Sequence, residues 1–373
     1  MTDHRDEGMV TMTDHRAGSR PGGLLATALI CILLAGCSSA GAGSPAETES
    51  TSRAKTQEAS DGSIPDPRDI RGPSTAETVT EVVPVEDHAK PKLPVMVVDQ
   101  SGNRVKVESA RRLLALDSYG TLAEIVVGLG LGDRLVGRGN SNTLTSMSKL
   151  PVVTQNGHEL NTEAILRLRP SLILTDTTIG PPDAMDRLRA SGITVVTFSP
   201  DRALSTVGTQ IRAVSHALGV DTGGDVLASR VESEIGAARK RIAGLTPDKP
   251  LRMVFLYLRG QAGVFFIFGK GMGSDDLIAS IGGRDVAAEA GVTGTKPASG
   301  EALAAADPEV ILVMTDGLES AGGVEALLDR PGIAQTAAGA HRRVVDMADG
   351  QILSFGPTTG AVLTSLADAV YRP

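Results

Sequence analysis

An internal repeat constrains the fold of this chain more than any other feature. Residues 161–174 (NTEAILRLRPSLIL) align without gaps onto residues 299–312 (SGEALAAADPEVIL), an offset of 138 positions with five identities. Both copies have the pattern of a short helix, a proline and an apolar strand, and a helix with a glycine-rich break precedes each. The period is far longer than the roughly 20 to 50 residues of solenoid repeats. We therefore expect one α/β lobe that is used twice.

The alternation of apolar runs and helical patterns from Leu93 onward supports this architecture. Short apolar strands separated by helices predict mainly parallel sheets. We place an N-terminal α/β lobe at 93–202, bridging helices at 203–246 and a C-terminal α/β lobe at 247–373. The second bridging segment is long enough, at roughly 30 Å, to join two lobes. Clefts between lobes are preferred ligand sites, so the predicted fold is two similar lobes with a ligand cleft between them.

The N-terminus has the pattern of an export signal. Arg16 and Arg20 precede an apolar run at 24–34 that is too short to span a bilayer. The run ends in Leu-Ala-Gly-Cys, which resembles the bacterial lipobox and predicts a signal peptide at 1–37 with Cys37 lipidated. The alternative is an ordinary signal peptide with an incidental cysteine. The motif MTDHR occurs twice, at 1–5 and 12–16, so translation starts at residue 1 or residue 12. Residues 38–92 are rich in Ser, Ala, Gly, Pro, Thr and Glu and predict a flexible tether.

Composition excludes several classes of function. The formal charge of −8 and the lack of a basic patch with interleaved aromatic residues argue against nucleic-acid binding. No G-x-S-x-G, H-E-x-x-H or C-x-x-C motif is present. A zinc or manganese carrier is disfavoured because such sites need three or four clustered ligands, and only one loop histidine, His158, is well placed.

The stretch FLYLRG at 255–260 predicts a ligand site. On a strand, Tyr257 and Arg259 share one face, about 7 Å apart. A lone strand tyrosine is usually a core residue, but a guanidinium within reach favours the phenolate form. Phenolate is a ligand of ferric haem, and the imidazole of His158, in a polar loop of the other lobe, can supply the opposite axial position.

The chain resembles the haem-binding lipoproteins of actinobacterial haem-uptake ABC transporters, which are helix-bridged substrate-binding proteins. The resemblance covers residues 105–373 and is carried by motifs such as QNGHELN, MVFLYLRG, FIFGKGMGSDDLI and MADGQILSFGP. It implies that His158 and Tyr257 ligate haem, that Arg259 supports the tyrosine and that Met314 lies close to the haem. Thr295 stands where some relatives have an aromatic residue.

Three further roles complete the prediction. In helix-bridged binding proteins, one glutamate per lobe docks onto the permease, which implies Glu163 and Glu301. The alternative is that these glutamates only complement the helix dipoles. Arg138 is a candidate partner for a haem propionate.

The sequence therefore predicts a lipid-anchored protein on the outer face of the cytoplasmic membrane. It would deliver haem to an ABC permease and its ATPase, and it would not be an enzyme. Two alternatives stay open: a ferric-siderophore or cobalamin carrier, and a lipid-anchored enzyme acting on a tetrapyrrole or metal complex. The carrier alternative is disfavoured because such pockets usually need several arginines or tryptophan faces, and the chain has no Trp.

Overall fold

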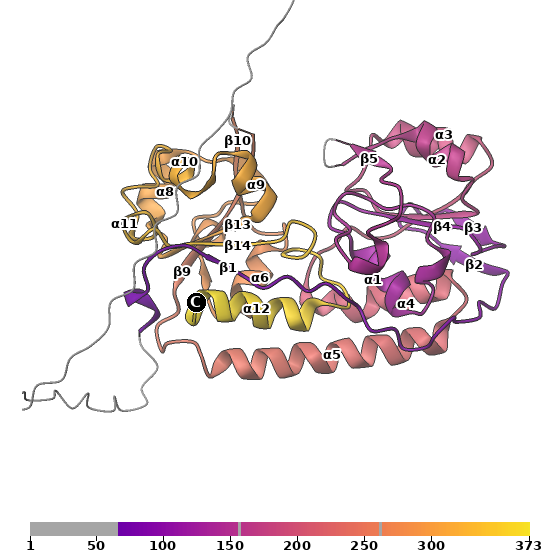
Figure 1. Ribbon diagram of the computed structural model, residues 1–373, viewed down its shortest axis with the longest axis horizontal. Coiled ribbons are helices and arrows are strands. Elements are labelled where there is room, and N and C mark those ends of the chain that lie inside the picture. The colour runs from indigo at the N-terminus through magenta and orange to yellow at the C-terminus, as the bar shows by residue number, and fades with distance from the viewer. Residues whose placement is uncertain (1–65, 156–157, 261–262) are drawn as a thin grey trace, which may run out of the picture. The chain divides into compact units, whose positions relative to one another are not determined.

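The computed structural model describes residues 66–155, 158–260 and 263–373, which form two α/β lobes over a long helix (Figure 1). The N-terminal lobe is built on a parallel sheet in the order β4 (Leu113–Leu116), β7 (Leu172–Thr175), β8 (Thr194–Thr197). All three strands are rich in apolar residues and almost fully buried, as expected for parallel strands covered on both faces. The remaining elements of this lobe are β2 (Val95–Val98), β3 (Arg104–Val107), α1 (Thr121–Gly128), η2 (Gly132–Arg134), η3 (Thr145–Met147), β5 (Thr154–Gln155), β6 (Glu159–Leu160), α2 (Thr162–Leu168) and α3 (Pro182–Ala190).

The C-terminal lobe is built on a larger mixed sheet. Its parallel part runs β1 (Ser74–Thr75), β14 (Val344–Met347), β13 (Val310–Met314), β9 (Arg252–Arg259), and antiparallel β10 (Val264–Phe268) and β12 (Thr295–Pro297) complete one edge. The fold is therefore the predicted one, with mainly parallel sheets. The other elements of this lobe are α6 (Ser274–Ser280), β11 (Arg284–Asp285), α7 (Val286–Glu289), α8 (Gly300–Ala306), α9 (Thr315–Ser320), α10 (Gly323–Leu328), α11 (Ala337–His341) and α12 (Thr359–Tyr371).

The two copies of the sequence repeat have the same local structure. Helices α2 and α8 begin at equivalent positions, where Asn161 and Ser299 cap the free backbone amides of Ala164 and Ala302. Both helices end in a residue with left-handed backbone, at φ 45° in one copy and φ 43° in the other. A buried strand, β7 or β13, follows in each case. The unit of helix, turn and strand is therefore repeated.

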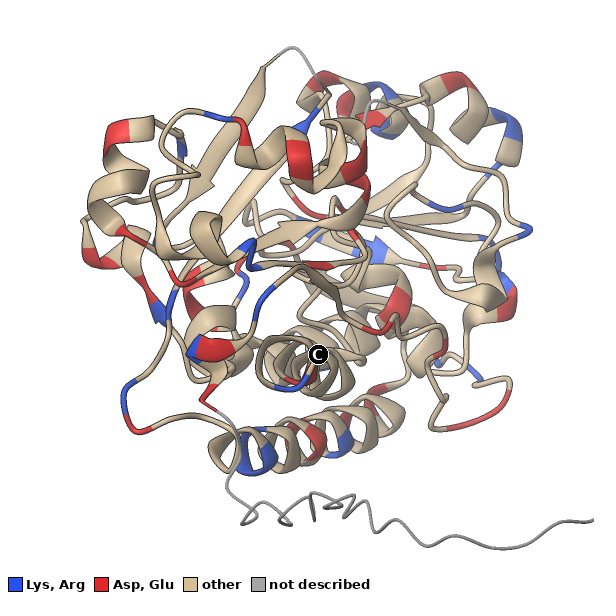
Figure 2. Ribbon diagram, turned by 60° about the vertical axis from the view of Figure 1, so that its left-hand side comes forward, with Lys and Arg blue, Asp and Glu red and all other residues tan. Residues whose placement is uncertain are grey.

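The lobes are joined by the 23-residue helix α5 (Asp221–Ala243), which follows η4 (Leu204–Thr206) and α4 (Val207–Ala217). Its buried face carries Leu227, Val231 and Ile235 and packs on α4 at one end and on α12 at the other. Its exposed face carries charges of both signs (Figure 2), including the i,i+4 pair Arg230–Glu234 at 3.7 Å. One continuous apolar core includes residues of α5 and of both lobes.

Residues 66–92, which we call the strap, correct the expected extent of the tether. Their amides bond to the C-terminal lobe first, where β1 pairs with β14, and then to the N-terminal lobe, where Val85 N donates to Gly128 O (2.9 Å) and Ala89 N to Gly130 O (3.2 Å). Figure 1 shows this indigo segment crossing from one lobe to the other. The composition of the strap is polar, but Val82 and Ala89 are buried. Its backbone forms hydrogen bonds with both lobes, which no local sequence pattern indicates. Residues 1–65, with Cys37, lie outside the described residues.

Within the described residues, none of the helices combines the length and the apolar character needed to span a bilayer.

Candidate ligand-binding cleft

A cavity of about 820 Å³ is lined by residues of both lobes. It brings together four of the predicted site residues, His158, Tyr257, Arg259 and Met314. The rest of its lining is Ser118, Tyr119, Asn140, Ser141, Thr178, Val264, Phe268, Asp316 and Asp349.

The carboxyl ends of parallel strands supply most of this lining. In the C-terminal lobe, β9 ends at Arg259, β13 ends at Met314, and Asp349 follows β14. In the N-terminal lobe, Tyr119 follows β4 and Thr178 follows β7. Ligands of open α/β sheets bind outside the carboxyl ends of the strands, so the two lobes present their usual ligand-binding edges to one shared cavity.

The Tyr257 side chain lies between an aromatic ring and a guanidinium. Its ring stacks on Phe268, with centroids 5.5 Å apart and an interplanar angle of 10°, and Phe268 stacks in turn on Phe255 at 5.3 Å. The strand register places Tyr257 and Arg259 on one face, and Arg259 Nε donates to the phenol oxygen at 3.3 Å. The Tyr257 ring is therefore oriented by its stacking on Phe268, and the guanidinium of Arg259 lies beside the phenol oxygen.

Asp349 anchors the far side of the same guanidinium. Its carboxylate accepts a hydrogen bond from Arg259 Nη2 and another from the backbone N of Asp316, at 2.8 Å. Burial acts against the charge of Arg259, but the bonds to Tyr257 and Asp349 raise the pKa of the guanidinium above its ordinary value. Burial raises the pKa of Asp349, Arg259 opposes that shift, and the nearby Asp316 adds to it.

His158 reaches the cavity from the opposite lobe. It lies in the turn between β5 and β6, and its backbone carbonyl accepts a hydrogen bond from Gly180 N at 3.0 Å. The turn is thereby tied to the loop after β7, and the imidazole is exposed rather than packed in the core. His158 therefore lines the cavity from the lobe opposite to the one that carries Tyr257.

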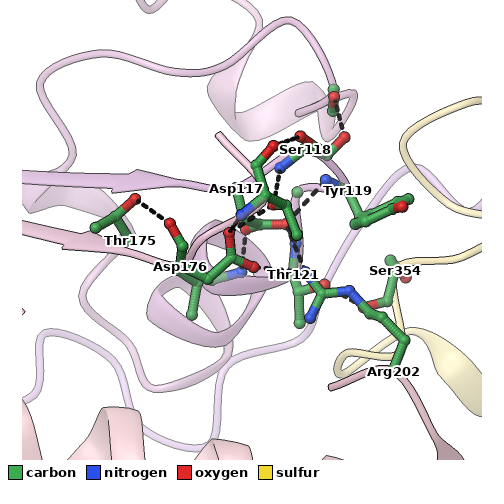
Figure 3. A network of polar contacts seen from close by, with 12 residues as sticks. Asp117, Ser118, Tyr119, Thr121, Thr175, Asp176, Arg202 and Ser354 are labelled. Atoms are coloured by element: carbon green, nitrogen blue, oxygen red, sulfur yellow. Dashed lines mark hydrogen bonds and ion pairs between the residues drawn. The ribbon is translucent and has the colours of Figure 1, made fainter. Parts of the chain in front are cut away.

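A buried ionic network supports the N-terminal wall of the cavity (Figure 3). Arg202 bonds Asp176 at 2.8 Å and Asp117 at 3.5 Å, and all three side chains are at most 3% exposed. Asp117 also accepts hydrogen bonds from three backbone amides at the start of α1, and the Arg202 guanidinium lies 4.9 Å from the ring centre of Tyr119. Burial and the neighbouring Asp117 raise the pKa of Asp176, which Arg202 partly opposes.

The same wall contacts the other lobe. Thr121 at the start of α1 donates to the backbone carbonyl of Ser354, and Glu124 accepts from Thr358 at 2.8 Å. Burial raises the pKa of Glu124 to about 8, against the hydrogen bonds from Thr358. The junction of the lobes therefore includes a carboxyl group that is neutral at pH 7.

A second hollow is slightly larger, at about 890 Å³, but it is a poorer candidate. The strap, α5 and α12 line it, and its lining includes no histidine, tyrosine or methionine. Its arginines are already paired, Arg241 with Asp368 at 2.8 Å and Arg230 with Glu234. We therefore assign the candidate site to the cavity that holds His158 and Tyr257.

Arg138, a predicted propionate partner, and Thr295, which stands where some relatives have an aromatic residue, do not line this cavity. The Arg138 guanidinium donates to the backbone carbonyls of Gly139 and Asn142, at 3.4 and 3.2 Å. Thr295 begins β12 on the edge of the sheet, opposite Phe268, and is exposed. The side chain of Arg138 is not part of the cavity lining. Its contact with a haem propionate stays a prediction.

Several cavity residues were missed by sequence reasoning. Tyr119, Thr178 and Asp349 each come two or three residues after an apolar strand, and that position was the available signal. Asn140 and Ser141 lie in an irregular loop and had no comparable signal. Among the described residues, no group of three or more His, Cys, Asp or Glu side chains is arranged to hold a bare metal ion.

The fold and the site define a class: a cleft-binding protein of two α/β lobes joined by a helix. A family model for periplasmic binding proteins matches residues 118–349, well over half of the chain, and the chain belongs to that family.

Relatives agree with this class. The crystal structure of the haem-binding protein HmuT is 45% identical, covers 83% of this chain and 100% of its own, and superimposes with a TM-score of 0.81. An uncharacterised ABC transporter substrate-binding lipoprotein of Bacillus subtilis, YvrC, is 26% identical over 74% of this chain and 86% of its own. The vitamin B12-binding protein of Vibrio cholerae is 31% identical, over 29% of this chain and 38% of its own.

Proposed function

We propose that this protein binds haem in the interlobe cavity and delivers it to an ABC permease on the outer side of the cytoplasmic membrane. The haem would be cargo, held between the lobes with His158 and Tyr257 as axial ligands. Arg259 would stabilise the phenolate form of Tyr257, and Met314 would contact the macrocycle. The protein would bind and release its ligand without transforming it.

The observation that carries this proposal is the meeting of an imidazole and an arginine-bonded phenol in one cavity, one from each lobe. These two groups are recognised axial ligands of ferric haem. The Phe268–Tyr257 stack and Val264 add apolar surface suited to a flat macrocycle. Solved structures of HmuT include alanine variants of a histidine, of a tyrosine and of an arginine two positions after that tyrosine. That spacing equals the spacing of Tyr257 and Arg259.

The partners follow from the same proposal. Glu163 and Glu301 lie in the first turn of the equivalent helices α2 and α8, one on each lobe. Both side chains are exposed, and that of Glu163 is 88% exposed with a long contact of 3.8 Å to Arg167. They are suited to dock onto arginines of a permease. Lipidation of Cys37 would hold the protein at the membrane.

The direct test is a titration of hemin into protein lacking residues 1–37. We expect a six-coordinate ferric spectrum with Soret and charge-transfer bands that saturate at one haem per chain. A spectrum of free hemin, or binding without saturation, would contradict the assignment.

Cobalamin is the second candidate, because the vitamin B12-binding protein matches part of the chain at 31% identity. A parallel titration with cobalamin separates the two ligands. Saturable binding of cobalamin with no change in the hemin spectrum would replace the haem proposal. A turnover assay on the bound tetrapyrrole, with product as its readout, addresses the enzyme alternative.

A further inference from the structure

The carboxylate of Asp349 occupies a specific place beside the proposed ligand. One carboxylate oxygen accepts a hydrogen bond from Arg259 Nη2, and the other accepts one from the backbone N of Asp316 at 2.8 Å. Asp316 is near the start of α9, and Asp349 follows β14, so the carboxylate is held between two elements of the sheet's carboxyl edge. Its side chain is 12% exposed, while that of Arg259 is 35% exposed.

Arg259 needs such an anchor if it is to face the phenol. An arginine side chain has roughly 2 kcal/mol of rotamer entropy, and Arg259 is the last residue of β9, with its side chain 35% exposed. The bond from its Nε to the Tyr257 oxygen is 3.3 Å, at the long end for a hydrogen bond. Among the described residues, the acidic group paired with Arg259 is Asp349.

We propose that Asp349 is a positioning residue for the Tyr257 ligand: it holds the guanidinium of Arg259 so that Nε points at the phenol oxygen. This inference rests on the proposed haem function and deepens it. Asp349 acts only through Arg259, so its effect on haem should vanish when the guanidinium is removed. A carboxylate that acted by its charge alone would keep its effect without Arg259.

A double-mutant cycle tests the coupling. Hemin affinity is measured for the unchanged protein, Asp349→Asn, Arg259→Ala and the double variant. We expect Asp349→Asn to weaken binding roughly tenfold, the size of one lost charge-assisted hydrogen bond, and to move the ferric spectrum toward that of Arg259→Ala. The double variant should bind hemin as Arg259→Ala does. Additive effects, unchanged affinity or tighter binding in Asp349→Asn would overturn the inference.

Asp346→Asn is the matched control for folding. Asp346 is also a buried carboxylate of the β14 segment and also contacts α9, accepting from Thr315 at 2.7 Å and from Thr75 at 2.9 Å, but it does not line the cavity. We expect this variant to lose thermal stability and to keep the haem spectrum. Asp349→Glu, which retains the charge, should recover part of the lost affinity. A spectral change in Asp346→Asn equal to that in Asp349→Asn would show that the effect is structural.

A measurement on the ligand-free protein separates this inference from the proposed function. The Nε–H resonance of Arg259 should exchange slowly in the unchanged protein and in Asp346→Asn, and rapidly in Asp349→Asn. If hemin does not bind the unchanged protein, the haem function is lost and the exchange rates alone decide the role of Asp349. If hemin binds but exchange is equal in all three proteins, the function stands and the positioning role is wrong.

Discussion

At the scale of single residues, the site depends on what surrounds one phenol. Tyr257 is stacked on Phe268 on one side and bonded to Arg259 on the other, so its oxygen has one orientation relative to the cavity. Tyr371, by contrast, is buried and donates to the backbone carbonyl of Ile281 at 2.8 Å. The chain therefore offers a tyrosine of the cavity and a tyrosine of the core for direct comparison.

Tyr257→Phe should weaken hemin binding by at least about tenfold, or ~1.4 kcal/mol, because a phenyl ring cannot ligate iron. Spectrophotometric titration measures the affinity, and the charge-transfer band reports the loss of the phenolate. Tyr371→Phe is the control: it should lower the free energy of unfolding by leaving the Ile281 carbonyl without a partner, with hemin affinity unchanged. Equal affinities in the two variants would remove the ligand role of Tyr257.

Sequence reasoning found the cavity residues of the proposed ligand site more readily than the residues that support them. His158, Tyr257, Arg259 and Met314 were found because each is of an unusual type for its position or matches a family motif. Asp349 is separated by 90 positions from the arginine it holds, and only the register of β9, β13 and β14 brings the two together. Contacts of that kind have no local pattern, so a single sequence does not reveal them.

At the scale of elements, helices α2 and α8 present the same feature on each lobe. We expect Glu163→Gln together with Glu301→Gln to lower haem uptake by cells severalfold while leaving hemin affinity unchanged, because both carboxylates lie outside the cavity lining. Haem-dependent growth and hemin titration measure the two quantities. Glu319→Gln, on the exposed surface of α9, is the matched control. Uptake that is equal in the double variant and in the control would argue against docking.

The free energy of unfolding should depend on pH through Glu124, a buried glutamate of helix α1. Glu124 keeps its proton in the folded protein up to about pH 8, whereas the ordinary pKa of a glutamate is 4.5. Between these values the unfolded chain binds fewer protons, so the free energy of unfolding should fall as pH rises, by at most about 1.4 kcal/mol per unit. Below 4.5 this contribution is fully present, and above 8 it is lost.

Glu124→Gln should remove this slope, because an amide keeps the shape and does not ionise. Urea unfolding between pH 5 and pH 8 measures it in both proteins. The difference between the two curves should grow toward high pH, where the unchanged protein must bury a charge. Parallel curves would show that Glu124 does not titrate in this range.

At the scale of the whole molecule, the repeat and the bridging helix were predictable because their periodicities are local. The strap was not, because its polar composition resembles that of a free tether. The strap contacts the N-terminal lobe at Gly130, which has a φ of 76°. A Cβ added to Gly130 would lie 1.8 Å from the backbone oxygen of Glu86 in the strap. Backbone hydrogen bonds and the buried side chains of Val82 and Ala89 hold the segment, and its close approach to the backbone of Gly130 leaves no space for a Cβ there.

Gly130→Ala should therefore loosen the strap. Gly192→Ala is the control, because Gly192 has a similar φ of 83° and open space around it. Both variants pay the cost of a left-handed alanine, about 1 kcal/mol, and Gly130→Ala should lose a further 1 to 3 kcal/mol or so from overpacking. Hydrogen exchange at Val85 and Ala89 reports the strap itself. Equal stability and equal exchange in the two variants would mean that the strap can move to accommodate the added methyl group without a loss of stability.

The strap, α5 and the contacts of α1 with the Ser354–Thr358 segment all cross between the lobes. Contacts that join the lobes in the folded chain reduce the conformational entropy that is lost when a ligand binds between them. A ligand that enters has to order few side chains, such as the exposed His158. Affinity in such a protein therefore depends on how well the walls of the cavity already match the ligand.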